Sequence, residues 1–201
     1  MRKNLMIIMA FMPFLTAYAQ DDKTVTAVAF HVTNSYQWPG QNTGIHSFYG
    51  LGGHINVYLN DRYYVGFSQM GSLAPSDLLK AGDLSPEKLR LYEYTLNAGL
   101  KFNLGSNLYM RTGLNGGVAL VSVGETQKID GINEFKSRYR TEYIVLSPQI
   151  NFGLPVNRYF SVEAGAAHKW YLGDKTLNGI RAGDFNGFAV SLSLVGRLPF
   201  D

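Results

Sequence analysis

The sequence predicts an all-β fold, an eight-stranded antiparallel up-and-down transmembrane β-barrel. Three observations predict it: long segments of two-residue alternation, connections that alternate between short and long, and a polar face with few charges. The most regular segment is Leu91–Leu104, where apolar and polar side chains alternate over about fourteen residues, against roughly five or six in an ordinary strand. A strand this long with one uncharged face fits a bilayer-spanning barrel better than a soluble sheet.

The first 19 residues have the pattern of a secretory signal peptide. Arg2 and Lys3 form a basic start, an apolar stretch follows over Leu5–Leu15, and Ala17-Tyr18-Ala19 is a small-x-small cleavage site. A membrane anchor is the alternative, but the apolar stretch is shorter than the roughly twenty residues of a spanning helix. We therefore expect cleavage near Ala19, which leaves residues 20–201 as the barrel domain. The two basic residues supply two of the three net positive charges, so the basic pI does not indicate nucleic-acid binding.

Eight segments alternate with a period of two, which places their apolar and polar side chains on opposite faces of a strand. They are Val25–Val32, Phe48–Leu59, Tyr63–Met70, Leu91–Leu104, Leu108–Val123, Tyr143–Leu154, Tyr159–Tyr171 and Phe188–Phe200. Their apolar faces carry, in chain order, Val28, Phe30 and Val32; Leu51, Ile55 and Val57; Tyr63, Val65 and Phe67; Leu96, Leu100 and Phe102; Leu114, Val118 and Leu120; Ile144, Ile150 and Phe152; Phe160, Val162 and Trp170; and Leu192, Leu194 and Leu198.

The connections between these segments alternate in length. The tight turns are Asn60-Asp61-Arg62, Gly105-Ser106-Asn107 and Val156-Asn157-Arg158, and the long polar connections are Thr33–Ser47, Gly71–Arg90, Gly124–Arg138 and Leu172–Asp184. Short turns on one side and long loops on the other are typical of outer-membrane barrels, and an even number of strands then places both chain ends on the short-turn side.

Three details of the long connections carry further expectations. Pro75-Ser76-Asp77 and Ser85-Pro86-Glu87 each resemble a helix start, so one or two short helices are expected in Gly71–Arg90. Asp130-Gly131 predicts a hairpin tip whose flanking strands extend beyond the membrane. Trp38 would either contact a partner or fold back onto the barrel rim.

Alternation does not by itself decide which face is outside, because a soluble ligand-binding barrel would turn the apolar face inward. The outer face of such a barrel would be dense in Lys and Glu, whereas here the polar face is mostly Gly, Ser, Asn, Thr and Ala. Aromatic residues also gather toward both ends of the apolar face, as in the two girdles of a membrane barrel. The girdle expected near the short turns is Tyr63, Phe102, Phe152, Phe160 and Phe200, and the one near the long loops is Phe30, Tyr92, Tyr94, Trp170 and Phe188.

These features make the chain similar to the small eight-stranded outer-membrane barrels of the OmpA/OmpX type, over nearly all of residues 20–201. The resemblance implies a Gram-negative outer membrane and a monomer in contact with lipid and lipopolysaccharide. It also implies that the last strand, Phe188–Phe200, is read by the barrel-assembly machinery. That family usually ends on the aromatic residue itself, whereas here Asp201 follows Phe200.

The polar face predicts an ion network inside the barrel. Its expected members are Glu93, Lys101, Arg111, Glu163 and Arg197, with Lys169, His31 and His54 on the same face. An eight-stranded barrel has room only for side chains, and buried charges must pair or lose several kcal/mol of solvation. The network is expected to plug the lumen, and a gate or an ion path is the alternative.

The residues favour no enzyme. His31 and Ser35 lie close in sequence, but no acid is placed to orient the histidine, and His168 has no neighbouring nucleophile. The four histidines lack metal-ligand spacing, and no cofactor motif is present. Cysteine is absent, so the chain has neither a disulfide framework nor a lipid-attachment cysteine.

The expected function is non-enzymatic: a structural or surface-interaction role through four extracellular loops, with a plugged polar lumen. Loop residues such as Lys136 and Arg138 would meet lipopolysaccharide phosphates, although acids are interspersed and a solvated mixed surface is the simpler interpretation. The alternatives are a narrow porin-like channel for small solutes, or an outer-membrane subunit of a secretion or conjugation assembly.

Overall fold

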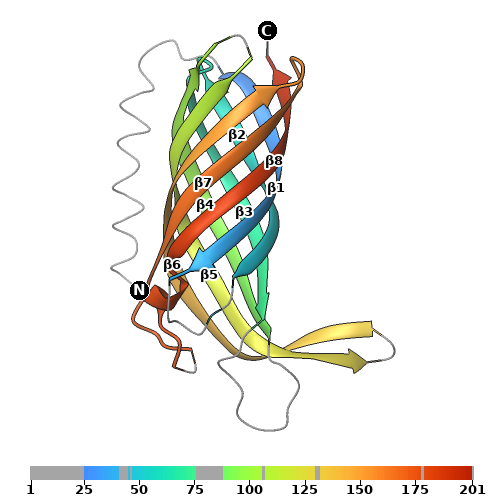
Figure 1. The fold of residues 1–201 in the computed structure, drawn as a ribbon, viewed down its shortest axis with the longest axis vertical. Helices are drawn as coiled ribbons and strands as arrows, with labels where there is room; N and C mark the ends of the chain where they lie inside the picture. The colour runs from blue at the N-terminus through green and yellow to red at the C-terminus, as the bar shows by residue number, and fades with distance from the viewer. Residues whose placement is uncertain are drawn as a thin grey trace.

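Eight antiparallel strands close into a single barrel in the computed structural model (Figure 1). The structure describes residues 25–40, 45, 47–75, 88–105, 107–129, 132–177 and 179–200. The strands are β1 (Val25–Pro39), β2 (Phe48–Leu59), β3 (Tyr63–Pro75), β4 (Lys88–Asn103), β5 (Tyr109–Ile129), β6 (Ile132–Pro155), β7 (Phe160–Leu172) and β8 (Gly187–Pro199). A short 3-10 helix, η1 (Ala182–Phe185), lies between β7 and β8. The predicted signal peptide lies outside the described residues.

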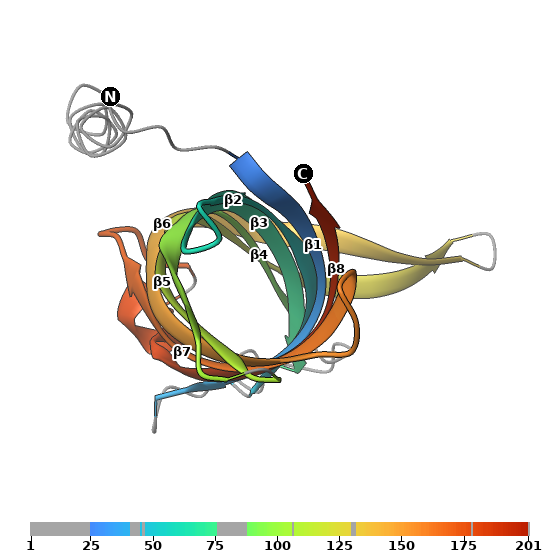
Figure 2. The ribbon, with the colours of Figure 1, turned by 90° about the horizontal axis from the view of Figure 1, so that it is seen from above.

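Each strand pairs with the next along the chain, and β1 pairs with β8 to close the ring, as the view along the barrel shows (Figure 2). Val32 faces Gly53 on β2 and Leu194 on β8, so both sides of β1 are hydrogen-bonded. Closure leaves no free sheet edge within the barrel wall, which a bilayer requires because it offers no water to unpaired backbone groups. Within the described ranges, no helix is both long and apolar enough to cross a membrane.

Several strands are longer than the alternation predicted. Strand β1 continues to Pro39, where the sequence predicted a loop from Thr33, because its polar Thr33-Asn34-Ser35 segment stays paired with β8. Strands β5 and β6 pair as far as Ile129 and Ile132, and their far ends project away from the barrel (Figures 1 and 2). The predicted tip Asp130-Gly131 and most of the predicted helical segment lie outside the described residues.

The first tight turn has the backbone of a type I′ hairpin. Asn60 and Asp61 have φ angles of 51° and 55°, and the N–H of Arg62 donates to the carbonyl of Leu59 at 3.2 Å. This turn, the turns after β4 and β6, and both described chain ends lie together, and we call this the short-turn end. The opposite end, which carries η1 and the β5–β6 projection, is the long-loop end (Figure 1).

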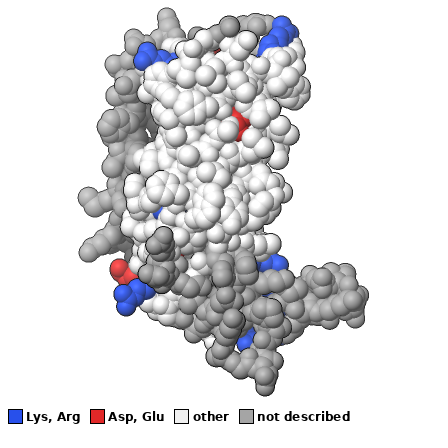
Figure 3. Space-filling model, viewed as in Figure 1, with Lys and Arg blue, Asp and Glu red and all other residues white. Residues whose placement is uncertain are grey.

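The barrel wall is apolar outside and polar inside, the reverse of a soluble barrel. Leu96 and Leu194 on the outer face are 70% and 64% exposed, whereas their neighbours Thr95 and Ser193 are buried in the lumen. On the face seen in Figure 3, the wall between the two ends is almost free of charged atoms. The prediction that the apolar side of Leu91–Leu104 faces outward is therefore confirmed for β4.

The outer aromatic residues lie toward both ends of the wall. Those with at least a third of their surface exposed include Tyr92, Tyr94, Phe152, Phe160, Trp170, Phe188 and Phe200, while Tyr63 and Phe102 are half-buried. Phe30 was expected near the long loops, but that placement is wrong: it faces Gly196, which also faces Phe160, so it lies toward the short-turn end. Trp38 belongs to β1, faces Phe188, and packs on Tyr36 with ring centroids 4.7 Å apart, which places it on the rim.

Candidate functional site in the lumen

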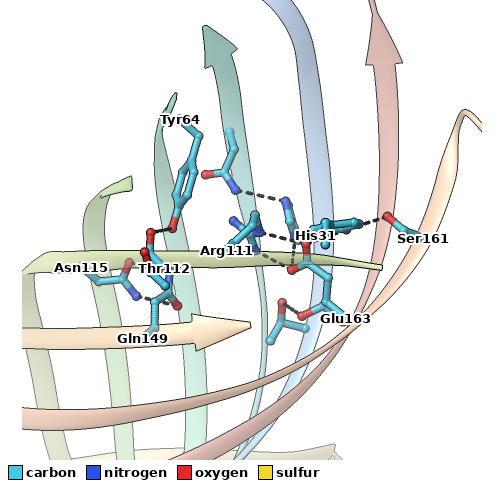
Figure 4. A network of polar contacts seen from close by, with 12 residues as sticks. His31, Tyr64, Arg111, Thr112, Asn115, Gln149, Ser161 and Glu163 are labelled. Carbon is cyan, nitrogen blue, oxygen red and sulfur yellow. Dashed lines mark hydrogen bonds and ion pairs between the residues drawn. The ribbon is translucent and has the colours of Figure 1, made fainter. Parts of the chain in front are cut away.

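A buried ion pair crosses the centre of the lumen (Figure 4). The Arg111 guanidinium on β5 donates through Nε to Glu163 Oε1 at 2.8 Å and through Nη2 to Oε2 at 2.5 Å. Tyr109 adds a hydroxyl that donates to the same Oε1 at 2.8 Å. Both charged side chains are at least 96% buried, and the two-point contact matches the planar fork of the guanidinium to the carboxylate.

Neutral polar groups complete this layer. His31 Nδ1 lies 3.6 Å from Glu163 Oε2, and His31 Nε2 lies 3.0 Å from the Asn56 amide. The Asn56 orientation that satisfies its neighbours directs the amide oxygen at His31 and at Arg111 Nη1, and the nitrogen at Asn97 Oδ1. The layer therefore takes residues from β1, β2, β4, β5 and β7, so its contacts span the lumen.

Inward-facing glycines make room for the aromatic rings of this layer. Tyr109 lies over Gly153 on β6, where an added Cβ would sit 2.1 Å from Tyr109 Cζ. Tyr64 lies across Gly113, where an added Cβ would sit 2.2 Å from the Tyr64 hydroxyl. The Arg111 guanidinium carbon is 4.9 Å from the centre of the Tyr64 ring, a cation–π contact that supports the ion pair from the other side.

A second ion pair lies nearer the long-loop end. Lys169 Nζ on β7 donates to Glu93 Oε2 on β4 at 2.5 Å, and the Tyr171 hydroxyl donates to Glu93 Oε1 at 2.6 Å. Gln37 lies 3.2 Å from the same hydroxyl through its Oε1 and donates through Nε2 to the backbone carbonyl of Phe185 at 2.9 Å. This layer therefore joins the barrel wall to helix η1. Between the two layers lies a cavity of about 60 Å³ lined mainly by small polar side chains.

An apolar cluster fills the lumen at the long-loop end. Phe185 of η1 is fully buried, and its ring centroid lies 5.7 Å from those of Tyr143 and Tyr171 and 6.0 Å from that of Phe48. The remaining members are Ile45, Leu89, Leu91, Ala119, Val121, Val123, Val145, Leu177, Ile180 and Ala182. The β7–β8 connection thus folds into the lumen at this end, and we call this inward-folded connection the Phe185 plug.

The structure divides the five predicted network residues among separate contacts. It brings Arg111 and Glu163 together, and it pairs Glu93 with Lys169. Arg197 forms an ion pair with Asp61 of the first tight turn, while Lys101 Nζ lies 4.8 Å from the Tyr109 ring centre and has no carboxylate partner in the described part of the chain.

The sequence analysis did not assign roles to Asp61, Tyr109, Asn56 or Tyr171. Tyr109 lies on the polar face of its predicted strand, so the two-residue alternation could have indicated that it points into the lumen. Asp61 was identified only as a residue of a predicted tight turn.

The isolated histidine and serine residues have separate partners. Ser35 Oγ contacts Met70 Sδ at 3.5 Å, away from the His31 contacts described above, and His168 packs its ring on Trp170 and Phe188 at the outer rim. Within the residues that the structure describes, no group of three or more His, Asp or Glu side chains lies close enough together to hold a metal ion.

Solved structures with the same architecture include several small bacterial barrels. Neisserial surface protein A is 14% identical, with 90% of this chain and 100% of that chain covered and a TM-score of 0.55. The outer membrane protein OprG from Pseudomonas aeruginosa is 11% identical, covering 88% and 97%, with a TM-score of 0.52. The fold is that of the small eight-stranded outer-membrane β-barrels.

The barrel domain of Pseudomonas aeruginosa OprF fits the same fold, with 14% identity, coverage of 87% and 98%, and a TM-score of 0.51. No protein-family profile matches the chain, and no curated protein does. At these identities the likeness carries the fold alone, so the role of the lumen and the loops depends on the chemistry of this chain's own residues.

Proposed function

We propose that this protein is a non-conducting, non-enzymatic barrel of the Gram-negative outer membrane that acts through its outer loops. The observation that supports it is that buried side chains lie across the lumen at three heights. An ion moving along the axis would meet the Arg111–Glu163 layer, then the Glu93–Lys169 layer, then the Phe185 plug. Separating the ion pair of the first layer alone would leave a buried charge without its partner, which costs about 3–5 kcal/mol of free energy.

The proposed membrane placement rests on the outer wall. The apolar band, the two aromatic zones and the closed sheet of the wall match what a bilayer selects. The nine proposed girdle residues would lie at the two interfaces, with Tyr63, Phe102, Phe152, Phe160 and Phe200 at one and Tyr92, Tyr94, Trp170 and Phe188 at the other. The same proposal includes signal-peptide cleavage near Ala19, insertion through the Phe188–Phe200 strand and a monomeric state.

The proposed surface role rests on the β5–β6 projection. Lys136, Arg138 and Arg140 are exposed on the part of β6 that extends past its pairing with β7, from the long-loop rim into the β5–β6 projection (Figure 1). Guanidinium and ammonium groups in such a position suit lipopolysaccharide phosphates. A protein of the envelope or of a host surface is the other class of partner that an extended hairpin suits.

Planar-bilayer recording tests the occluded lumen. Wild-type protein should give no ion current, and Glu163→Gln should give none either, because the Glu93 layer and the Phe185 plug remain. Steady current through folded wild-type protein would overturn the proposal and favour the narrow channel. Folding is verified by heat-modifiable gel migration of the same samples.

Vesicle binding tests the surface role separately. Liposomes that contain lipopolysaccharide should retain the purified protein, and a variant with Gln at positions 136, 138 and 140 should be retained less. The control is Arg62→Gln, which removes an exposed positive charge at the short-turn end and should be retained as wild type is. Equal retention of both variants would exclude the proposed binding of lipopolysaccharide phosphates by these three residues. Crosslinking from the β5–β6 projection would then test a subunit role in a secretion or conjugation assembly.

A further inference from the structure

A cavity of about 270 Å³ lies at the short-turn end of the lumen, between that end and the Arg111–Glu163 layer. Its wall includes three cationic side chains, Lys101, Arg158 and Arg197, but only one carboxylate, that of Asp61. The described wall therefore carries two uncompensated positive charges. This space is many times what one water molecule needs, which leaves room for a tetrahedral anion with its hydration.

Two of these cationic side chains, Lys101 and Arg197, lie near the ring of Tyr58. Lys101 Nζ and Arg197 Cζ are each 5.8 Å from the centre of the Tyr58 ring, which is buried. Arg197 donates through Nη2 to Asp61, but its Nε is buried and lacks a hydrogen-bond partner. Two like charges gathered at one half-buried site repel each other and favour an anion between them.

The nearest interior carboxylate is not available to neutralise them. Glu163 already accepts hydrogen bonds from Arg111 at both oxygens, and its Oε1 also accepts from Tyr109. Lys101 contacts Tyr109 through the ring face, and no carboxylate of the described chain lies within ion-pair distance of its Nζ. Among the described residues, the positive charge surplus of the cavity wall is therefore separate from the ion pairs that cross the lumen.

We propose that this cavity binds a phosphate group, held by Lys101 and Arg197 against the Tyr58 ring. A phosphate monoester carries a charge of about −1.5 to −2 at neutral pH, which matches the surplus. The Arg197 side chain, which is 27% exposed in the cavity wall, supplies a planar guanidinium, and Lys101 supplies a point charge; both kinds of group bind phosphates in proteins. The phosphate belongs either to a free solute or to a lipid headgroup at this end of the barrel.

Titration calorimetry on folded protein in maltoside micelles, which contain no phosphate, tests the proposal. Inorganic phosphate should bind with saturation at one site per chain, and Lys101→Gln should weaken the binding by about tenfold or more. Lys101→Arg, which keeps the charge, should bind within about threefold of wild type. The matched control is Arg62→Gln, which removes the same charge at the same end but outside the cavity wall, and should bind as wild type does.

Competition separates the two sources of phosphate. Phosphatidic acid, a lipid that ends in a phosphate monoester, should abolish the phosphate titration when added to the micelles if a lipid headgroup is the natural occupant, whereas glycerol phosphate alone should do so if it is a free solute. The proposal is overturned if wild-type protein shows no saturable binding of either probe, or if Lys101→Gln and Arg62→Gln bind phosphate equally well. Heat-modifiable migration verifies that each variant is folded.

Discussion

Arg111 and Glu163 form a two-point ion pair across the lumen although their strands, β5 and β7, are separated along the wall by β6. The partners are 52 residues apart in sequence, and the contact exists only once the barrel has closed. Because both groups are buried, the energy of the pair depends on whether each charge keeps its partner. Removing one partner and removing both are therefore expected to have different consequences.

Glu163→Gln should lower the free energy of unfolding by about 3–5 kcal/mol, because it leaves the Arg111 charge buried and unpaired. The double variant Arg111→Met/Glu163→Leu should lose clearly less, since it removes both charges and keeps the volume apolar. The measurement is urea unfolding in lipid vesicles, followed by tryptophan fluorescence. Asp61→Asn is the control: it breaks the exposed pair with Arg197 and should cost at most about 1 kcal/mol. A double variant as unstable as Glu163→Gln would show that the unpaired Arg111 charge is not the cause of the lost stability.

Gly153→Ala should destabilise the barrel by about 1–3 kcal/mol, because the new methyl group would overlap the Tyr109 ring at 2.1 Å. Gly116→Ala is the matched control, since its Cβ would meet only the flexible end of Leu146 at 3.3 Å. Both variants are compared by the same urea unfolding. Adding Tyr109→Leu should restore part of the stability lost in Gly153→Ala, and no restoration would mean that the ring is not the obstacle.

Alternation predicted the wall well because it depends on local geometry alone. A period of two assigns each side chain to a face, so Leu96 and Thr95 could be placed outside and inside before the register was known. The outer limit of β1 was less predictable, since Thr33-Asn34-Ser35 is polar on both faces. Its strand conformation comes from pairing with β8, which is distant in sequence.

The partners inside the lumen were harder to predict than the side chains that face it. Which charges meet depends on the stagger between strands, and that stagger is set by the whole closed sheet. Glu93 therefore meets Lys169, and Arg197 meets Asp61 rather than Glu163. The Phe185 plug was missed for a related reason. The inward-facing residues of β4, β5 and β6 become apolar toward the long-loop end, but only the fold shows which loop covers this apolar surface.

Phe185→Ala should open the long-loop end of the lumen to water and lower the unfolding free energy by about 3–5 kcal/mol. The chain has no cysteine, so a single cysteine can report on access. Val121→Cys, fully buried beneath the plug, should react with a charged thiol reagent many times faster when Phe185→Ala is added. The control adds Phe188→Ala, which removes an exposed aromatic ring from the outer wall. Equal labelling rates in the two double variants would mean that the Phe185 plug does not close the lumen.

Leu96→Arg should oppose folding into bilayers by about 2–4 kcal/mol, since this side chain lies midway along β4 on the apolar outer face. Leu198→Arg, close to the short-turn end on the same face, should cost only about 0–1 kcal/mol, because an arginine there reaches the interface. Unfolding in phosphatidylcholine vesicles measures both. The depth dependence separates a lipid-facing wall from a water-facing one, because a wall in water would tolerate arginine equally at both positions. Equal and small effects at positions 96 and 198 would contradict the membrane placement.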